Sequence, residues 1–259
     1  MEFFSGLPAW LQALFATLFT YGMTAAGASL VFLSKRLNKT VLTATMGLAA
    51  GIMIAASFFS LLLPAMERAE VGGKSEASLI LTIGFLAGGA FIMISDAVLC
   101  RMEKFRSKEN RGGVLMCAAM TLHNIPEGFA VGVAFGCVAG EASALVSAVM
   151  LALGIGIQNF PEGLCVAVPL KNSGVSAGRA FFIGQASGAV EVPAGVLGAV
   201  AVGAISALLP WALAFSAGAM IAVVCSELIP TGFAQNKTAA AVGILLGFSL
   251  MMFLDVFLG

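Results

Sequence analysis

Two short motifs place polar side chains inside apolar stretches of the chain. HNIPEG, at 123–128, contains the only histidine, and QNFPEG follows at 158–163. On a helix, residues four positions apart share a face, so the first and fifth residues of each motif point the same way, with the asparagine beside them. The side chains that could bind a ligand here are His123, Asn124, Glu127, Gln158, Asn159 and Glu162.

Each motif also contains a proline, which has no backbone N–H. Pro126 and Pro161 leave the carbonyls of Leu122 and Ile157 without their usual donors, and proline kinks a helix interior. Inside a membrane, freed carbonyls are tolerated only where they line a polar site. The glycine after each glutamate lets a neighbouring helix approach closely. The motifs therefore predict two kinked helices that converge on one polar site.

The chemistry of these side chains suits a divalent metal ion. An ionised carboxylate inside a membrane is costly, so it normally faces a cavity, a partner or a metal. Imidazole together with carboxylate and carbonyl oxygens suits Zn²⁺, Fe²⁺ or Mn²⁺. Two glutamates on antiparallel helices could bridge a pair of ions, and Glu191, close to Pro193, could add a third carboxylate. The five cysteines form no CxxC pair, so a thiolate zinc site is not indicated.

Two other interpretations of the motifs stay open. The polar side chains could form a buried network that only joins helices, although such a network would not call for the same six-residue pattern twice. They could also relay protons, because pumps place Asp and Glu in the membrane as well. A proton relay does not explain why Asn and Gln accompany the carboxylates.

The elements that must position these residues are membrane helices. Of the 259 residues, 60% are hydrophobic and 10% are charged, which indicates an integral membrane protein. Charged residues lie in short islands between apolar runs of about 20 residues, the length of a helix that crosses a bilayer. The sequence predicts an all-α integral membrane protein with eight transmembrane helices at about 9–33, 41–63, 78–100, 114–137, 143–170, 178–202, 209–230 and 238–258.

Further sequence similarities indicate an internal duplication. AAGIMIA at 49–55 resembles SAGAMIA at 216–222, and the segment 84–99 matches 243–258 with an aspartate at the same position of each. Chance similarity between Gly-, Ala- and Leu-rich helices is the alternative. Because paired spans would run in opposite directions, the repeat is expected to be inverted, a recurring design of secondary transporters. We expect a single transmembrane transporter domain over 1–259, with inverted repeats over about 9–100 and 178–258 and central motif helices over 114–170.

The basic residues predict the orientation of the chain. With the N-terminus outside, all of the 13 Lys and Arg residues except Arg68 and Lys74 fall in inside loops, so both termini are expected to be extracytoplasmic. No basic region precedes the first apolar run, so we expect that run to stay as an anchor rather than be cleaved. The charged run at 101–113 is expected to be a solvated cytoplasmic loop.

The doubled [HQ]-N-x-P-E-G motif resembles that of the ZIP (Zrt-, Irt-like) family of divalent metal transporters, and the Gln158 variant looks like its prokaryotic GufA-like branch. The likeness covers essentially the whole chain. It implies eight helices in a 3+2+3 inverted-repeat bundle, a binuclear site at the membrane midplane, a homodimer and an elevator-type alternation of access.

The resemblance also implies roles for individual residues. His123, Glu127, Gln158 and Glu162 would hold the principal ion, and Asn124, Asn159, Glu191 and the two shared glutamates a second. Met53 stands where these transporters can offer a thioether, with a core-facing or lipid-facing methionine as the alternative. Ser60, Glu67 and Glu227 would lie along the path of the ion, and Asp96 and Asp255 would be path residues or interhelical partners.

The expected function is the transport of divalent metal ions, chiefly Zn²⁺ uptake across the plasma or inner membrane, with no prosthetic group and no nucleic-acid partner. Gln158 stands where many relatives have histidine, so a carrier of broader specificity for Fe²⁺, Mn²⁺ or Cd²⁺ is an alternative, as is a metal-selective channel. A membrane metalloenzyme is disfavoured, because the chain has one histidine and no HExxH motif. We therefore expect that the protein is not an enzyme.

Overall fold

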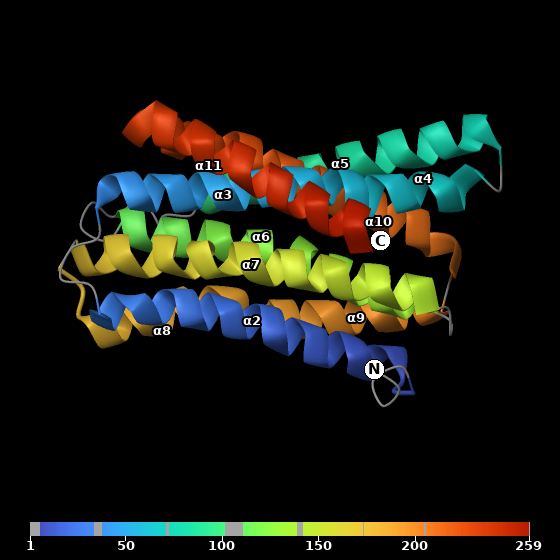
Figure 1. Ribbon diagram of the computed structural model, residues 1–259, viewed down its shortest axis with the longest axis horizontal. Coiled ribbons are helices and arrows are strands. Elements are labelled where there is room, and N and C mark those ends of the chain that lie inside the picture. The colour runs from blue at the N-terminus through green and yellow to red at the C-terminus, as the bar shows by residue number, and fades with distance from the viewer. Residues whose placement is uncertain are drawn as a thin grey trace.

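A computed structural model describes residues 6–33, 38–70, 73–101, 111–138, 142–172, 174–204 and 206–258. The regular structure within these ranges is entirely helical, which confirms the all-α prediction. In Figure 1, α6 and α7 lie between α3 and α11 on one side and α2 and α8 on the other. The side chains of His123 and of residues 111–119 lie outside the described part.

The helices follow the predicted spans to within a few residues at most ends. Their bounds are α2 Ala9–Leu33, α3 Lys39–Ala56, the π-helical turn η1 Ser57–Leu62, α4 Leu63–Ala69, α5 Lys74–Arg101, α6 Arg111–Gly136, α7 Ala142–Asn172, α8 Ala177–Gly188, α9 Glu191–Ala204, the 3-10 turn η4 Ser206–Leu208, α10 Leu209–Val223, the π-helical turn η5 Val224–Leu228 and α11 Ile229–Leu258.

Six stretches of the described chain are long and apolar enough to cross a membrane. They are Ala9–Leu33, Lys39–Ala69, Lys74–Val98, Ala144–Asn172, Ala177–Val202 and Leu209–Phe257. The last one joins two of the predicted spans, and Asn236, with φ −157° and ψ 96°, interrupts the helix between them. The predicted span 114–137 corresponds to α6, many of whose side chains are not described. The membrane class is thereby supported, while the count of eight spans stays a prediction.

Two π-helical turns interrupt the long helices: η1 lies between α3 and α4, and η5 lies between α10 and α11. In η1 the N–H of Leu63 bonds to the carbonyl of Phe58, and in η5 the N–H of Ile229 bonds to that of Val224, five residues back in each case. A proline follows each turn closely, Pro64 in one helix and Pro230 in the other. Because proline donates no hydrogen bond, the regular four-residue ladder is interrupted there.

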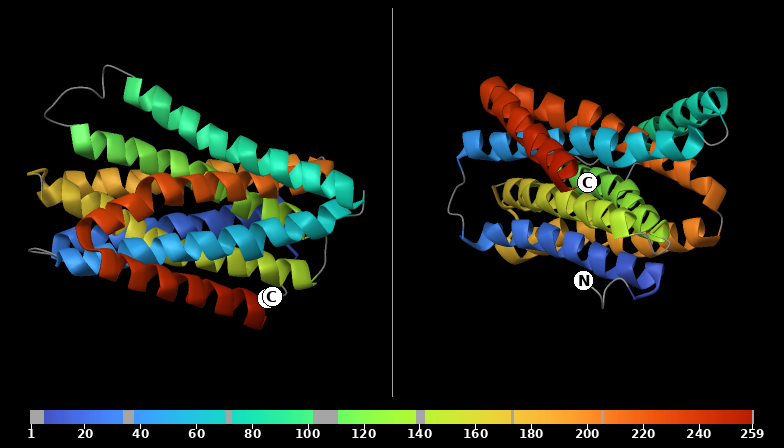
Figure 2. Two further views of the ribbon diagram at one scale, coloured as in Figure 1. Left: turned by 90° about the horizontal axis from the view of Figure 1, so that it is seen from above. Right: turned by 45° about the vertical axis from the view of Figure 1, so that its right-hand side comes forward.

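Helix pairs form the main contacts of the bundle. The four most extensive are α3 with α11, α5 with α10, α2 with α7 and α6 with α9 (Figure 2). Glycines let the backbones in these pairs touch: a Cβ on Gly88 would lie 1.8 Å from the carbonyl oxygen of Phe215, and one on Gly247 would lie 2.1 Å from that of Leu48. Small residues at such crossings are typical of membrane helices.

Candidate metal centre

The two motif helices cross at the centre of the protein with their polar side chains buried. Pro126 lies inside α6 and Pro161 inside α7, and both helices continue past these prolines. Five motif side chains are at most 3% exposed, namely those of Asn124, Glu127, Gln158, Asn159 and Glu162. Polar groups that are buried so completely need a hydrogen-bond partner or a charge partner.

Gln158 and Glu127 join the two motifs directly. The Nε2 of Gln158, on α7, donates a hydrogen bond of 2.7 Å to Oε1 of Glu127, on α6. The contact brings the first position of one motif to the fifth position of the other, as expected for antiparallel helices. The two motifs therefore contribute to one site, as the sequence predicts.

A break between α8 and α9 adds a third part of the site. Helix α8 ends at Gly188, and α9 begins at Glu191. Pro193 has no N–H to bond to the carbonyl of Ala189, so the helix cannot continue regularly across this point. The carbonyl of Ser187 lies in the last turn of α8, where helix carbonyls lack a partner, and it accepts a bond of 2.8 Å from Nδ2 of Asn124.

Glu191 is buried at the start of α9 and accepts hydrogen bonds on both carboxylate oxygens. Nδ2 of Asn159 donates to Oε1 at 2.8 Å, and the hydroxyl of Thr20, on α2, donates to Oε2. The same Nδ2 lies 3.2 Å from the carbonyl oxygen of Thr20. Three helices, α2, α7 and α9, thus meet at this carboxylate.

Several buried oxygens of the motifs accept no hydrogen bond from the described groups of the protein. They are Asn124 Oδ1, Glu127 Oε2, Gln158 Oε1, Asn159 Oδ1 and Glu162 Oε2. An isolated buried acceptor is costly, and a concentration of such acceptors matches the ligand preference of a divalent cation. The carboxylates of Glu162 and Glu191 also lie close enough to Glu127 to repel it. A cation would offset this repulsion.

Carboxylates alone do not complete a metal site in the part of the protein that the structure describes. Among the described side chains, no three of the types His, Cys, Asp and Glu come together closely enough to hold an ion. The described polar neighbour of Glu127 is an amide instead, because Gln158 donates its Nε2 hydrogen to Oε1 of Glu127.

Three of the predicted path residues line one cavity of about 630 Å³. Ser60, Glu67 and Asp255 face it from η1, α4 and α11, together with Arg68 and Cys137. The hydroxyl of Ser60 donates a 2.8 Å bond to Oδ1 of Asp255. Apolar residues form most of the rest of the lining, and they come from α6, α7 and α10 as well as from η1, α4 and α11.

The other predicted residues lie apart from this cavity. Glu227, in η5, and Asp96, on α5, are both partly buried, and their carboxylates are close enough to repel each other. Met53 is 1% exposed on α3 and belongs to the large apolar core of the bundle. The structure thus separates the five path candidates into two groups.

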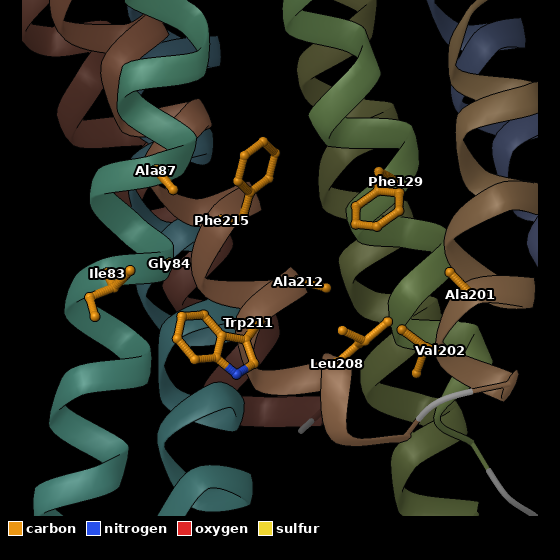
Figure 3. A pocket seen from close by; sticks show the side chains of 10 residues that line it. All are labelled: Ile83, Gly84, Ala87, Phe129, Ala201, Val202, Leu208, Trp211, Ala212 and Phe215. Carbon is orange, nitrogen blue, oxygen red and sulfur yellow. The ribbon is translucent and has the colours of Figure 1, made fainter.

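A second cavity, of about 330 Å³, has an entirely apolar lining. Figure 3 shows Trp211 and Phe215 of α10 facing it from one side and Phe129 of α6 from the other. It provides no oxygen or nitrogen ligand that would suit a cation, so it is not a candidate for the metal centre.

Thr20 is the site residue that the sequence analysis did not predict. Threonine occurs in many apolar helices, so its presence alone carries little information. The sequence does carry one indication: small and hydroxyl-bearing residues recur every three or four positions along α2. In the structure these residues, Ala13, Thr17, Thr20, Thr24 and Ala28, are all buried. Such a row marks the face of a membrane helix that packs against other helices.

The fold and the buried polar cluster define the class: a helical membrane protein with buried carboxylates and amides where its two motif helices meet. Comparisons with known proteins then give its family. A family model described as ZIP Zinc transporter matches residues 101–255. Zinc transporter ZIP11 of Xenopus tropicalis is 37% identical over 328 residues, covering 96% of this chain and 98% of the relative.

Two bacterial relatives extend the comparison. Zinc transporter GufA of Myxococcus xanthus is 38% identical over 258 residues, covering 95% of this chain and 98% of the relative. Zinc transporter ZIPB of Bordetella bronchiseptica is 37% identical over 250 residues, covering 92% and 79%. The chain belongs to the ZIP family. The predicted family is therefore confirmed, and so is the prediction that the protein is not an enzyme, because these relatives are transporters.

Proposed function

We propose that the protein carries divalent metal ions, chiefly Zn²⁺, across a cell membrane into the cytoplasm. The observation that supports this most strongly is the group of buried oxygens without donors on the two helices that carry the repeated motif. The relatives are named zinc transporters, which supports zinc as the ion and transport as the process.

The proposed principal ion is held by His123, Glu127, Gln158 and Glu162. Of these, Glu127, Gln158 and Glu162 each have an oxygen that accepts no hydrogen bond from the described groups. Gln158 can present its carbonyl oxygen to the ion while its Nε2 keeps Glu127 in place. The absence of a thiolate among these residues keeps the site labile, as transport requires.

The proposed second ion lies between the shared glutamates and Asn124, Asn159 and Glu191. Both asparagines use their Nδ2 to bond backbone or carboxylate oxygens, which leaves Oδ1 free to face a cation. Met53 is an optional thioether ligand in this proposal. Its place in the apolar core favours a packing role.

The proposed architecture is a 3+2+3 bundle of eight transmembrane helices with inverted repeats over about 9–100 and 178–258. The alignment of the repeats maps the pair α3 and α11 onto α10 and α5, and both pairs are extensive. It also maps the approach of Gly88 to Phe215 onto that of Gly247 to Leu48. Matching contacts at matching positions support a duplication.

We further propose that the ion enters at the cavity of Ser60, Glu67 and Asp255 and leaves past Asp96 and Glu227. The repeat maps Ser60 onto Glu227 and Asp255 onto Asp96, so an inverted arrangement places the two groups at opposite ends of the protein. With both termini extracytoplasmic, the cavity faces outward. Helix α2 begins and α11 ends toward the same end of the bundle, which supports a common side for the termini (Figure 1).

Alternating access is the proposed mode of transport, in a homodimer in the plasma or inner membrane. The five described polar side chains of the motifs are almost completely buried, so an ion bound to them would be closed off from both sides. A carrier must open such a site to one side at a time, whereas a channel would need a continuous path. An amide at Gln158 in place of an imidazole favours acceptance of Fe²⁺, Mn²⁺ or Cd²⁺ beside Zn²⁺.

Zinc uptake into proteoliposomes tests the proposal. We expect saturable uptake by the wild-type protein and a loss of more than roughly tenfold in Glu127→Gln, because even outer partners of metal ligands have effects of that size. Glu76→Gln is the matched control, since Glu76 is exposed at the start of α5. Absence of metal uptake by the wild type, or a Glu127→Gln variant equal to Glu76→Gln, would overturn the proposal.

A further inference from the structure

Glu191 differs from the other two carboxylates of the site in how it is held. Both of its oxygens accept hydrogen bonds, from Asn159 at 2.8 Å and from the hydroxyl of Thr20. Glu127 and Glu162 each keep one oxygen that accepts no hydrogen bond from the described groups. Thr20, Asn159 and Glu191 are all 0% exposed, so water does not compete for these bonds.

The hydroxyl of Thr20 bonds to another helix, whereas the hydroxyls of the neighbouring threonines Thr17 and Thr24 bond within α2. Thr17 donates to the carbonyl of Ala13 at 2.8 Å, and Thr24 lies 3.4 Å from the carbonyl of Thr20, both within the same helix. Thr20 also lies 3.1 Å from the carbonyl of Thr17. A hydroxyl has only one hydrogen to donate, and a carboxylate is the stronger acceptor, so the hydrogen of Thr20 goes to Glu191.

In the proposed repeat, two asparagine–carbonyl hydrogen bonds are equivalent, whereas the bond between Thr20 and Glu191 occurs only once. In the register that aligns 49–55 with 216–222, Thr20 corresponds to Ser187 and Thr24 to Glu191. Asn124 donates to the carbonyl of Ser187 as Asn159 donates to that of Thr20, so these two bonds are equivalent. The carboxylate of Glu191 has no counterpart in the first repeat, where Thr24 stands.

We propose that Thr20 is a positioning residue that competes with the metal ion for the carboxylate of Glu191. Its hydrogen bond fixes the orientation of the carboxylate and withdraws electron density from the oxygen, which makes Glu191 a weaker ligand. The ion at the second position is therefore bound loosely enough to leave. The inference rests on the proposed function, because it assigns a role within the same site.

Removal of the hydroxyl should tighten binding and slow release. Thr20→Val replaces the hydroxyl by a methyl group of similar size, and we expect the KM for Zn²⁺ uptake into proteoliposomes to fall roughly tenfold, the order expected for a hydrogen bond to a charged group. The maximal rate should fall as well, because release becomes slower. Thr20→Ser keeps the hydroxyl and should restore wild-type kinetics.

Thr17→Val is the matched control. Thr17 has the same burial on the same helix, one turn away, but its hydroxyl bonds only within α2. We expect the KM of this variant to equal that of the wild type. A general packing defect would change the KM of Thr17→Val and of Thr20→Val by the same amount. Equal KM values for the two variants would therefore overturn the inference.

A second background tests whether Thr20 acts through Glu191. In Glu191→Leu no acceptor for the Thr20 hydroxyl is left at this position, so adding Thr20→Val should have no further effect on KM. An equal decrease in KM in both backgrounds, or an increase in KM in Thr20→Val alone, would contradict the inference. If Thr20→Val does not accumulate in the membrane, Thr20→Ala removes the same hydroxyl with less steric demand. Failure of the wild type to transport any metal would overturn the proposed function instead.

Discussion

At the scale of single residues, the two ends of the Gln158 amide are in different environments. Its Nε2 binds Glu127 at 2.7 Å, and its Oε1 is buried without a donor among the described groups. In the proposed site, the amide would orient one ligand while it serves as another. An imidazole at this position would offer a nitrogen ligand in place of the carbonyl oxygen, and its other ring N–H could donate to a carboxylate.

Gln158→His should shift the ion preference toward Zn²⁺. Imidazole suits zinc, whereas carbonyl oxygen suits Mn²⁺ and similar ions. In a competition assay of uptake, we expect Mn²⁺ to inhibit Zn²⁺ uptake severalfold less in the variant than in the wild type. Gln185→His, which adds an imidazole on α8 where the side chain contacts Tyr21 rather than a motif residue, should leave the competition unchanged. An identical ion profile for Gln158→His and the wild type would contradict this prediction.

A repeated motif allows some contacts between residues to be predicted from sequence. Two motifs with helical spacing on neighbouring antiparallel helices predict that their polar side chains meet, and Gln158 does contact Glu127. The contact of Thr20 with Glu191 could not be predicted, because it joins residues of α2 and α9 that no motif links. Which threonine of α2 faces a carboxylate depends on the rotation of the helix, and three buried threonines offered equal choices.

At the scale of elements, the π-helical turns place Ser60 and Glu227. Each turn inserts one residue more than a regular helix would, so it rotates the side chains that follow it around the helix axis. Hydropathy cannot reveal such a turn, because the apolar run continues through it. The break between α8 and α9 was likewise hidden inside the predicted span 178–202, although Pro193 stood beside it.

Pro64→Ala should raise stability and lower transport. Alanine supplies the N–H that a regular helix needs, and proline inside a helix costs about 3 kcal/mol. We expect a higher midpoint of thermal unfolding in detergent and slower zinc uptake, because Ser60 would turn away from Asp255. Pro210→Ala is the control, since α10 follows the 3-10 turn η4, whereas α4 continues directly from η1 and α3. Unchanged uptake in Pro64→Ala would show that the turn has no part in transport.

Gly88→Ala tests the close contact of α5 with α10. The added Cβ would lie 1.8 Å from a backbone oxygen of Phe215, so the two helices would have to separate. Overpacking of this kind costs about 1–3 kcal/mol. We expect a lower midpoint of thermal unfolding than for Gly22→Ala, whose Cβ would meet no atom within 4 Å. Equal midpoints for the two variants would mean that the helices do not touch at Gly88.

For the whole molecule, the sequence predicted the order and type of the elements better than their arrangement. The predicted span 143–170 agrees closely with α7, Ala142–Asn172, because apolar runs and charged loops determine where a membrane helix begins and ends. The pairing of α2 with α7 and of α6 with α9 depends on small residues scattered along each helix. No single stretch of sequence shows which partner such a face will contact.

The cysteines offer a test of the orientation of the whole protein. Cys137 lines the cavity that contains Glu67 and Asp255, and it is partly exposed. Cys225 is exposed in η5, toward the opposite group of path residues. If both termini are extracytoplasmic, Cys137 lies at the outer end of the protein and Cys225 at the inner end.

A membrane-impermeant maleimide added to intact cells should therefore modify a variant that retains only Cys137 and leave unmodified a variant that retains only Cys225. Permeabilised cells supply the control, because the reagent then reaches both sides of the membrane. Zinc uptake by the Cys137 variant should fall after modification, since the added group occupies the cavity of about 630 Å³ through which the ion is proposed to enter. Labelling of Cys225 but not of Cys137 in intact cells would show that the orientation is the opposite of the proposed one. Full zinc uptake after complete labelling of Cys137 would show that the ion does not pass through this cavity.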